Sequence, residues 1–268
     1  MRLLNRTTRR VSPTAEGLEF YQRCKQVISD LEQAETSVSH PGGLPSGRLR
    51  IGMPSALGRM WVIPRLPEFV RTYPSVSLEI VIGDFIARSN REGLDATVQV
   101  GEMPSSRQIV RKLTSVDYVV CASPKYLETR GVPEKPGDLS NHACLTYRRP
   151  RNGQIRQWRF ASGKSIERCN VSGFMMFNSG EALISAAAAG LGLIQVAVYY
   201  AQPWLEAEKL VEVLADYKAH AYDVSVVFQQ RKRKAPRLRV FIDFLVDLFN
   251  PSPWSSQSEY GPYKSHDQ

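Results

Sequence analysis

Two short polar stretches lie where a strand is expected to end and a helix to begin. Pro54-Ser55-Ala56 follows an early predicted strand, and Asn178-Ser179-Gly180 precedes a helix predicted over 180–189. The first N–H groups of a helix are unpaired and the helix dipole is positive there, so either place could bind a carboxylate or a phosphate. Alternatively, Ser55 and Asn178 only cap their helices, the commoner role of these residue types. The sequence leaves both interpretations open.

Motifs for catalysis are missing from the sequence. It contains no G-x-S-x-G turn, no H-E-x-x-H helix, no Walker loop and no G-x-G-x-x-G opening of a strand–helix unit. The GLGL run at 190–193 follows a predicted helix and therefore indicates a turn. The four cysteines and four histidines are scattered, whereas a structural zinc site needs clustered ligands. We expect no enzyme activity, no bound metal and no cofactor.

Positive charge is concentrated in short runs. The formal net charge is +9, of which residues 1–12 carry +4 and residues 231–240 carry +6, leaving −1 for the rest. A third basic run lies at 148–159. A polyanion such as DNA recognises local positive charge, although most basic runs are only solvated surface. We interpret 148–159 and 231–240 as solvated surface, and the context given below favours a nucleic-acid contact for 1–12.

Length and composition indicate a soluble globular protein of one or two domains. The chain has 268 residues, of which 43% are hydrophobic and 23% charged. No stretch approaches the ~18 uncharged apolar residues of a membrane span. The basic start MRLLNRTTRR is not followed by the apolar core of a signal peptide. We therefore expect a cytoplasmic protein without a membrane partner.

Residues 13–40 are predicted to form one long helix that pairs with a second copy of the chain. Thr14 can cap its N-terminus. Apolar residues recur at spacings of four and three, the heptad pattern of paired helices, at Phe20, Cys24, Val27, Leu31, Ala34 and Val38. A helix lying on its own domain would show a similar stripe. The hinge at 41–47, rich in glycine and proline, favours dimerisation because it disconnects the helix from the body.

The body alternates strands and helices, which predicts an α/β fold with a largely parallel sheet. Strands are expected around 49–51 and at 76–83, 95–101, 108–114, 117–122, 144–147, 158–160, 168–173, 210–214 and 224–228. Helices are expected up to Tyr73 and at 124–129, 180–189 and 238–248, with another strand and an Ala/Tyr-rich helix after Gly190. Gly190 suits the left-handed end of a helix. The Pro/Ser-rich segment 251–268 is expected to be disordered.

The segment RLLNRTTRRVSPTAEGLEFY resembles the wing and linker-helix start of LysR-type transcriptional regulators, which carry R-L-F-x-R-x-x-R-x-V-x-L-T-x-A-G. The matching residues are Arg2, Leu3, Arg6, Arg9, Val11, Thr14 and Gly17. Departures from the pattern are Leu4, Pro13 and the reversed Ala15-Glu16. Further matches include GRLRIGMPSALGR, LPEFVRTYPSVSLEI, GLDATVQVGEMPSS and GEALISAAAAGLGL, so the resemblance covers residues 2–249.

The resemblance implies an effector-binding region of two α/β subdomains, similar to periplasmic solute-binding folds. The implied units are a winged-helix remnant at 1–12, the linker helix, subdomain I at 48–122 plus 223–250, and subdomain II at 123–222. A small ligand would bind in the cleft between the subdomains. The implied effector-binding positions are Ser55, Ala56, Gly101, Glu102, Tyr147, Asn178 and Ser179. One departure stands beside the cleft, where the family usually has a proline and this chain has Gln195-Val196.

The resemblance also implies DNA contacts in the wing, by Arg6, Thr7, Thr8, Arg9 and Arg10. Family members place three helices before the wing, and the last of them reads the major groove, whereas this sequence begins at the wing. Phosphate contacts position a protein without specifying sequence. We therefore expect weak or lost operator recognition by residues 1–268 alone.

The implied function is a LysR-type regulator that senses a small anionic effector and forms a homodimer or homotetramer. Two alternatives stay open. One is a solute-binding protein of the same fold that serves transport, and the other is a truncated partner that modulates a full-length regulator.

Overall fold

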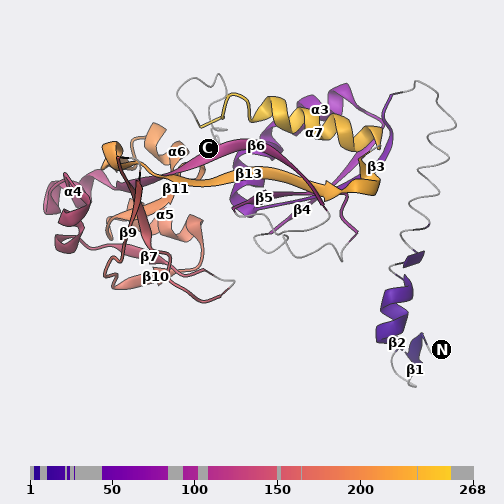
Figure 1. The fold of residues 1–268 in the computed structure, drawn as a ribbon, viewed down its shortest axis with the longest axis horizontal. Helices are drawn as coiled ribbons and strands as arrows, with labels where there is room; N and C mark the ends of the chain where they lie inside the picture. The colour runs from indigo at the N-terminus through magenta and orange to yellow at the C-terminus, as the bar shows by residue number, and fades with distance from the viewer. Residues whose placement is uncertain are drawn as a thin grey trace.

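The structure consists of two α/β lobes joined by two long strands, as Figure 1 shows. It is a computed structural model that describes residues 3–6, 11–21, 23–24, 27, 44–83, 93–101, 108–149, 152–163, 165–233 and 235–254. None of the helices in this described part of the chain has the length and apolar character needed to span a bilayer.

The N-terminal residues form a small hairpin followed by a helix. Strands β1 (Leu4–Arg6) and β2 (Val11–Pro13) pair antiparallel, with Leu4 opposite Pro13. The Thr14 hydroxyl accepts a hydrogen bond from the N–H of Gly17 at 3.0 Å, so the predicted cap is confirmed. The described residues that follow, 15–21, 23–24 and 27, are helical. The remainder of the predicted helix and residues 41–43 of the hinge lie outside the described residues.

The first lobe is built on three parallel strands. Strand β3 (Gly47–Met53) pairs with β4 (Val76–Ile82) on one side and with β5 (Ala96–Val100) on the other. Leu49 and Ile51 of the predicted strand are fully buried, and so is Met53 two residues further on, because every second side chain of a strand lies on the same face. The strands predicted over 76–83 and 95–101 are confirmed apart from their ends.

The helical run between β3 and β4 is divided into short turns. It consists of α2 (Ser55–Leu57), a π-helical turn at Gly58–Val62, a 3-10 turn at Ile63–Arg65 and α3 (Leu66–Thr72). The two prolines of the predicted helix stand in the first turn of the last two pieces, where the missing N–H costs nothing. Helix α7 (Pro236–Leu248) packs beside α3, with the rings of Phe69 and Phe241 edge to face at 5.2 Å (Figure 1).

A single strand, β6 (Gln108–Ala122), replaces the two strands predicted at 108–114 and 117–122, so that prediction is wrong. Its first part pairs antiparallel with β13 (His220–Gln229). Its last part pairs with β11 (Ile194–Ala197) and β12 (Val211–Val213) of the second lobe. Strand β6 is continuous because its direction stays the same where its pairing partner changes from β13 to β11 and β12.

The sheet is mixed, which corrects the expectation of a largely parallel one. The β3–β4 and β3–β5 pairs are parallel, whereas β13 runs antiparallel to both β5 and β6. β11 and β12 also run antiparallel to β6. The cause is that β6 leads from the first lobe to the second and β13 leads back (Figure 1).

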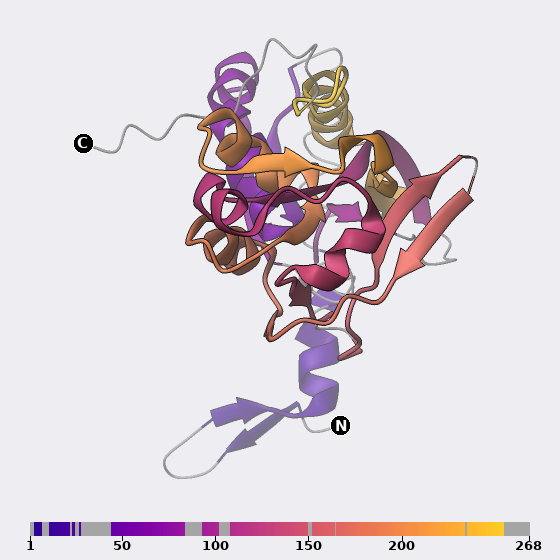
Figure 2. The same ribbon diagram turned by 90° about the vertical axis from the view of Figure 1, so that its left-hand side faces the viewer.

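The second lobe contains most of the remaining elements. These are α4 (Pro124–Arg130), a 3-10 turn (Pro136–Asn141), β7 (Leu145–Tyr147), β8 (Trp158–Ser162), β9 (Ser165–Cys169), β10 (Met175–Phe177), α5 (Gly180–Ala188) and α6 (Val198–Glu206). Figure 2 shows the β8–β9 hairpin projecting from this lobe. The strand predicted over 168–173 is displaced, since β9 ends at Cys169 and β10 begins only at Met175. Gly190, with φ +86°, ends α5 in the left-handed region as predicted.

The start of the predicted disordered tail packs between the lobes. Trp254 is only 7% exposed, and its ring centroid lies 5.6 Å from that of Trp61 and 5.8 Å from that of Tyr199 in α6. The expectation of disorder over 251–268 therefore does not hold for 251–254, because this tryptophan buries a large apolar surface. Residues 255–268 lie outside the described residues.

Candidate functional site

An arginine is enclosed by aromatic rings where β6 enters the second lobe. Arg156 is 9% exposed, and its guanidinium carbon lies 4.7 Å from the ring centroid of Tyr118 in β6 and 5.2 Å from that of Tyr147 at the end of β7. Its Nη2 donates to the backbone carbonyl of Gln195, while its Nε has no hydrogen-bond partner. Within the described residues no carboxylate forms an ion pair with it.

The aromatic contacts continue from this arginine into the first lobe. The Tyr118 ring meets that of Tyr222 in β13 edge to face at 5.7 Å, and Arg159 lies 5.8 Å from the Tyr222 ring. A Cβ placed on Gly101, just after β5, would lie 3.6 Å from the Tyr222 ring. A line of contacts therefore runs from Gly101 through Tyr222, Tyr118 and Arg156 to Tyr147 in the other lobe.

Tyr118 offers a buried hydroxyl to this junction. The residue is 1% exposed, and its hydroxyl has no hydrogen-bond partner of good geometry. Burial raises the pKa of the Tyr118 phenol, the charge of Arg156 opposes this rise, and the neighbouring Tyr222 phenol adds to it. A phenol is protonated at neutral pH even at its ordinary pKa of 10, so the Tyr118 O–H is a donor.

Gln195 links the two arginines to the edge of the sheet. Its side-chain Oε1 accepts the N–H of Arg159 at 2.9 Å, and its Nε2 donates to the carbonyl of Arg159 at 2.7 Å. Its backbone carbonyl accepts the bond from Arg156. The departure from the family pattern that was noted at Gln195-Val196 thus forms part of the wall around these arginines.

The predicted helix-start residues lie at the first turns of α2 and α5. Ser55 is the first residue of α2, whose N-cap is Pro54 and has no side-chain cap bond. Ser179, not Asn178, caps α5, and its Oγ accepts the N–H of Ala182 at 3.3 Å. The capping role suggested for Ser55 and Asn178 is therefore wrong for both residues. Ala56 is buried beside Ser55.

An ion pair brings the two helix starts towards each other. Arg59, in the turn after α2, lies 3.1 Å from Glu181 in the first turn of α5. Glu181 already places a carboxylate at the positive end of α5. The ion pair links the segments that follow Ser55 and Ser179, whereas Gly101 and Tyr147 belong to the line of contacts through Arg156. Glu102 lies outside the described residues.

The predicted DNA-binding and dimerisation residues are only partly described. Arg6 ends β1, and Thr7, Thr8, Arg9 and Arg10 lie outside the described residues, between the two strands of the hairpin. In the predicted stripe, Phe20 is 48% and Val27 66% exposed, while Cys24 is partly buried. Leu31, Ala34 and Val38 lie outside the described residues.

Four residues of the junction were not predicted from the sequence: Arg156, Arg159, Tyr118 and Tyr222. The interpretation of the basic runs 148–159 and 231–240 as solvated surface is wrong for several of their members. Arg156 is enclosed by rings, Lys232 forms a largely buried ion pair with Asp95 at 2.7 Å, and Arg237 is buried under Gly47. A usable signal was the alternation in Gln157-Trp158-Arg159-Phe160, whose two aromatic residues face the core.

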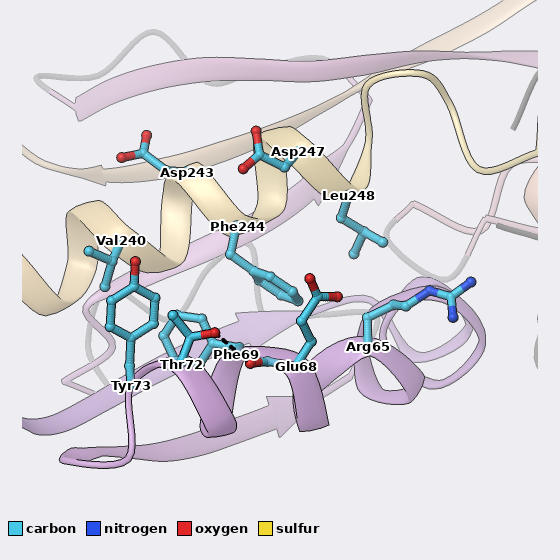
Figure 3. Close-up of a pocket in the computed structure, with 10 residues that line it drawn as sticks. All are labelled: Arg65, Glu68, Phe69, Thr72, Tyr73, Val240, Asp243, Phe244, Asp247 and Leu248. Atoms are coloured by element: carbon cyan, nitrogen blue, oxygen red, sulfur yellow. Dashed lines mark hydrogen bonds between the residues drawn. The ribbon is translucent and has the colours of Figure 1, made fainter. Parts of the chain in front are cut away.

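A separate cavity of about 210 Å³ lies between α3 and α7 on the outside of the first lobe (Figure 3). Its lining residues are Arg65, Glu68, Phe69, Thr72, Tyr73, Val240, Asp243, Phe244, Asp247 and Leu248. Figure 3 shows apolar side chains at its base and the carboxylates of Glu68, Asp243 and Asp247 around it. No residue predicted for effector binding lines this cavity.

Comparison with known families identifies the body of the chain. The family model described as the LysR substrate binding domain matches residues 42–250. The chain belongs to the LysR family. A curated relative of this LysR protein is the HTH-type transcriptional regulator YhjC of Escherichia coli K12. The two are 34% identical over 246 residues, which cover 92% of this chain and 82% of YhjC.

Solved structures show the same fold as this LysR protein. CrgA, a LysR-type regulator from Neisseria meningitidis, is 27% identical with a TM-score of 0.68, over 92% of this chain and 83% of CrgA. Full-length AphB, a virulence activator from Vibrio cholerae, is 25% identical with a TM-score of 0.66, over 92% of this chain and 84% of AphB. The resemblance and the α/β fold class inferred from the sequence are thereby confirmed.

Proposed function

We propose that this chain senses a small molecule at the junction of its two lobes and acts as part of a LysR-type transcriptional regulator. The observation that carries the proposal is the line of contacts from Gly101 to Tyr147 through Tyr222, Tyr118 and Arg156. It joins predicted effector positions of both lobes, and it includes a buried cation and a buried hydroxyl that are incompletely bonded. Small-ligand sites are commonly built where two such units meet.

The two crossing strands supply a route by which binding could change the shape of the protein. Tyr118 belongs to β6 and Tyr222 to β13, the strands that pass between the lobes. A ligand held by residues of both lobes stabilises the lobe arrangement that it fits best. Because β13 is paired with β5 of the first lobe and β6 is paired with β13, a rotation of the second lobe would be transmitted along both strands.

Dimerisation through the N-terminal helix is the second part of the proposal. Phe20 and Val27 present apolar side chains to solvent, which is costly for an isolated helix and is relieved when a second copy covers them. The pairing would give a homodimer, or a homotetramer if the lobes associate as well. The predicted heptad stripe continues through Leu31, Ala34 and Val38, which would contact the partner helix in the same way.

DNA is the proposed macromolecular partner, in the cytoplasm. The β1–β2 hairpin brackets Thr7–Arg10, so these residues would stand at the tip of a wing. Arginines there would contact phosphates, and such contacts weaken as salt rises because counterions are released on binding. In the proposed mechanism, the effector alters the lobe arrangement, and the dimer transmits this change to the spacing of its DNA contacts.

The sensing role can be tested by screening small molecules for an increase in melting temperature and mapping the hits by amide hydrogen exchange. A compound that binds the folded protein raises its melting temperature. The proposal expects hits to protect β6 and β13 near Tyr118 and Tyr222. Protection confined to α3 and α7, which line the outer cavity, or the absence of any hit from a broad library, would contradict it.

A further inference from the structure

Building on the proposed sensing role, we propose that the effector is a small organic carboxylate and that Arg156 is the residue that binds its carboxylate group. The Tyr118 hydroxyl would donate a second hydrogen bond to the same group. Arg156 belongs to the second lobe, and Tyr118 belongs to the crossing strand β6. Neither residue was predicted from the sequence as part of the effector site. The proposal assigns both the chemical class of the ligand and its anchoring residue.

The junction contains a buried positive charge that no described negative charge balances. Arg156 is nine-tenths buried, and within the described residues no carboxylate pairs with it. Arg159 adds a second cation close by, over the Tyr222 ring. Burial of a cation without an anion is costly, and cation–π contacts offset only part of the cost. An anionic ligand would supply the missing charge.

The hydrogen-bonding capacity of the site favours a carboxylate. A guanidinium has five N–H donors in a planar fork that matches the two oxygens of a carboxylate. In Arg156 the Nη2 already binds the Gln195 carbonyl, and the Nε has no partner. The ring of Tyr118 contacts this guanidinium, and its buried hydroxyl, which has no hydrogen-bond partner, is a further O–H donor. Charge-assisted bonds of this kind are about twice as strong as neutral ones.

The surrounding residues hold the arginine in place. Tyr118 and Tyr147 contact the guanidinium, and Gln195 fixes the backbone of Arg159 three residues further on. A preorganised cation loses little freedom on binding, which favours affinity. Because the site is enclosed, the ligand would enter only when the lobes move apart along β6 and β13, so occupancy and lobe arrangement would be linked.

The test compares charged probes with neutral isosteres on the full chain. Benzoate and succinate are measured beside benzamide and succinamide, by thermal shift and by calorimetry. The proposal expects at least one carboxylate to raise the melting temperature while its amide does not. Arg156→Gln should weaken binding at least about tenfold, Arg156→Lys should weaken it less, and Tyr118→Phe should weaken it several-fold. Arg111→Gln is the matched control, since Arg111 is an exposed arginine of β6 paired with Asp243 away from the junction.

The outcomes separate this proposal from the sensing role. Stabilisation by amides as strong as by carboxylates, with junction protection, would retain the sensing role and overturn the carboxylate assignment. Stabilisation by neither set would overturn the carboxylate assignment, while the sensing role is judged by the broader screen. Unchanged carboxylate binding by a folded Arg156→Gln variant would also overturn it.

A separate arm tests an internal counter-ion. If Glu102, which follows Gly101 in the sequence, balances Arg156, then Glu102→Gln and Arg156→Gln should lower the melting temperature of the ligand-free protein equally. Such a result would assign Arg156 a structural role and overturn the proposal. The proposal expects Arg156→Gln to leave the ligand-free melting temperature unchanged or to raise it, because the variant removes an uncompensated buried charge.

Discussion

The side chain of Gln195 in β11 bonds both backbone groups of Arg159 in β8. Its amide accepts the Arg159 N–H at 2.9 Å and donates to the Arg159 carbonyl at 2.7 Å, so one buried residue imitates a strand partner. The same residue accepts a bond from Arg156 through its own carbonyl. This glutamine therefore ties the β8–β9 hairpin and both junction arginines to the crossing sheet.

Gln195→Ala is expected to lower the free energy of unfolding by about 2 kcal/mol, because it leaves partly buried backbone groups of Arg159 unpaired. Urea unfolding measures the change. Gln202→Ala is the control, since Gln202 bonds Glu206 on an exposed helix face and should cost less than about 0.5 kcal/mol. Equal losses in the two variants would show that the Gln195 bonds contribute little.

Trp254 is expected to be a structural residue of the junction. The ring of Trp254 contacts Trp61, Tyr199 and Phe249, and these contacts are lost both in a chain that ends at 250 and in Trp254→Ala. Either change should lower the free energy of unfolding by about 3–5 kcal/mol. A chain that ends at Trp254 keeps these contacts and serves as the matched control. Chemical denaturation of the three proteins decides the question. If all three unfold at the same urea concentration, the packing of Trp254 is energetically unimportant.

The exposed apolar residues of the N-terminal helix are expected to hold two copies together. Phe20→Asp combined with Val27→Asp should shift the protein to a smaller species in analytical ultracentrifugation, because charges at heptad core positions are strongly unfavourable. Glu19→Gln alters the same helix, breaking only an exposed ion pair with Arg23, and should leave the size unchanged. Dimerisation through this helix is excluded if the double variant sediments like the original protein.

Two of the four cysteines are expected to resist thiol reagents. Burial raises the pKa of the Cys144 thiol to about 12, with Cys169 adding to the rise, and burial also raises that of Cys121. Only the thiolate reacts, so at pH 8 the partly buried Cys24 and Cys169 should be labelled while Cys121 and Cys144 remain unlabelled until urea is added. Counting labelled thiols in native and denatured protein checks this, and rapid native labelling of four thiols would contradict it.

The same thiols predict a loss of stability in alkali. Their ordinary pKa is 9.0, and the folded values are higher, so above pH 9 the unfolded chain releases protons that the folded chain retains. The unfolded state then binds fewer protons, and the free energy of unfolding falls as pH rises from 9 towards 12. Cys144→Ala should flatten this dependence in urea titrations at several pH values. An unchanged slope would mean that Cys144 ionises alike in both states.

Features that depend on neighbours along the chain were predicted from the sequence. Residues around 49–51 were predicted to form a strand, and Leu49 and Ile51 are fully buried in β3; residues 238–248 were predicted to form a helix, and Phe241, Leu245 and Leu248 form part of the buried face of α7. These patterns are local because a strand repeats every two residues and a helix every 3.6. Within the candidate site, Gly101 and Tyr147 came from the family resemblance, which also rests on local motifs.

What the tertiary structure alone decided depends on residues far apart in the sequence. β6 is one strand because its partners change from β13 to β11 and β12, and nothing between 114 and 117 signals that change. Arg156 stands in a basic run typical of surface, and it is buried because rings from β6 and β7 close over it. Trp254 is ordered because Trp61 and Tyr199 receive it. Burial is a property of the assembled chain, since each of these side chains is enclosed by groups that only folding brings near.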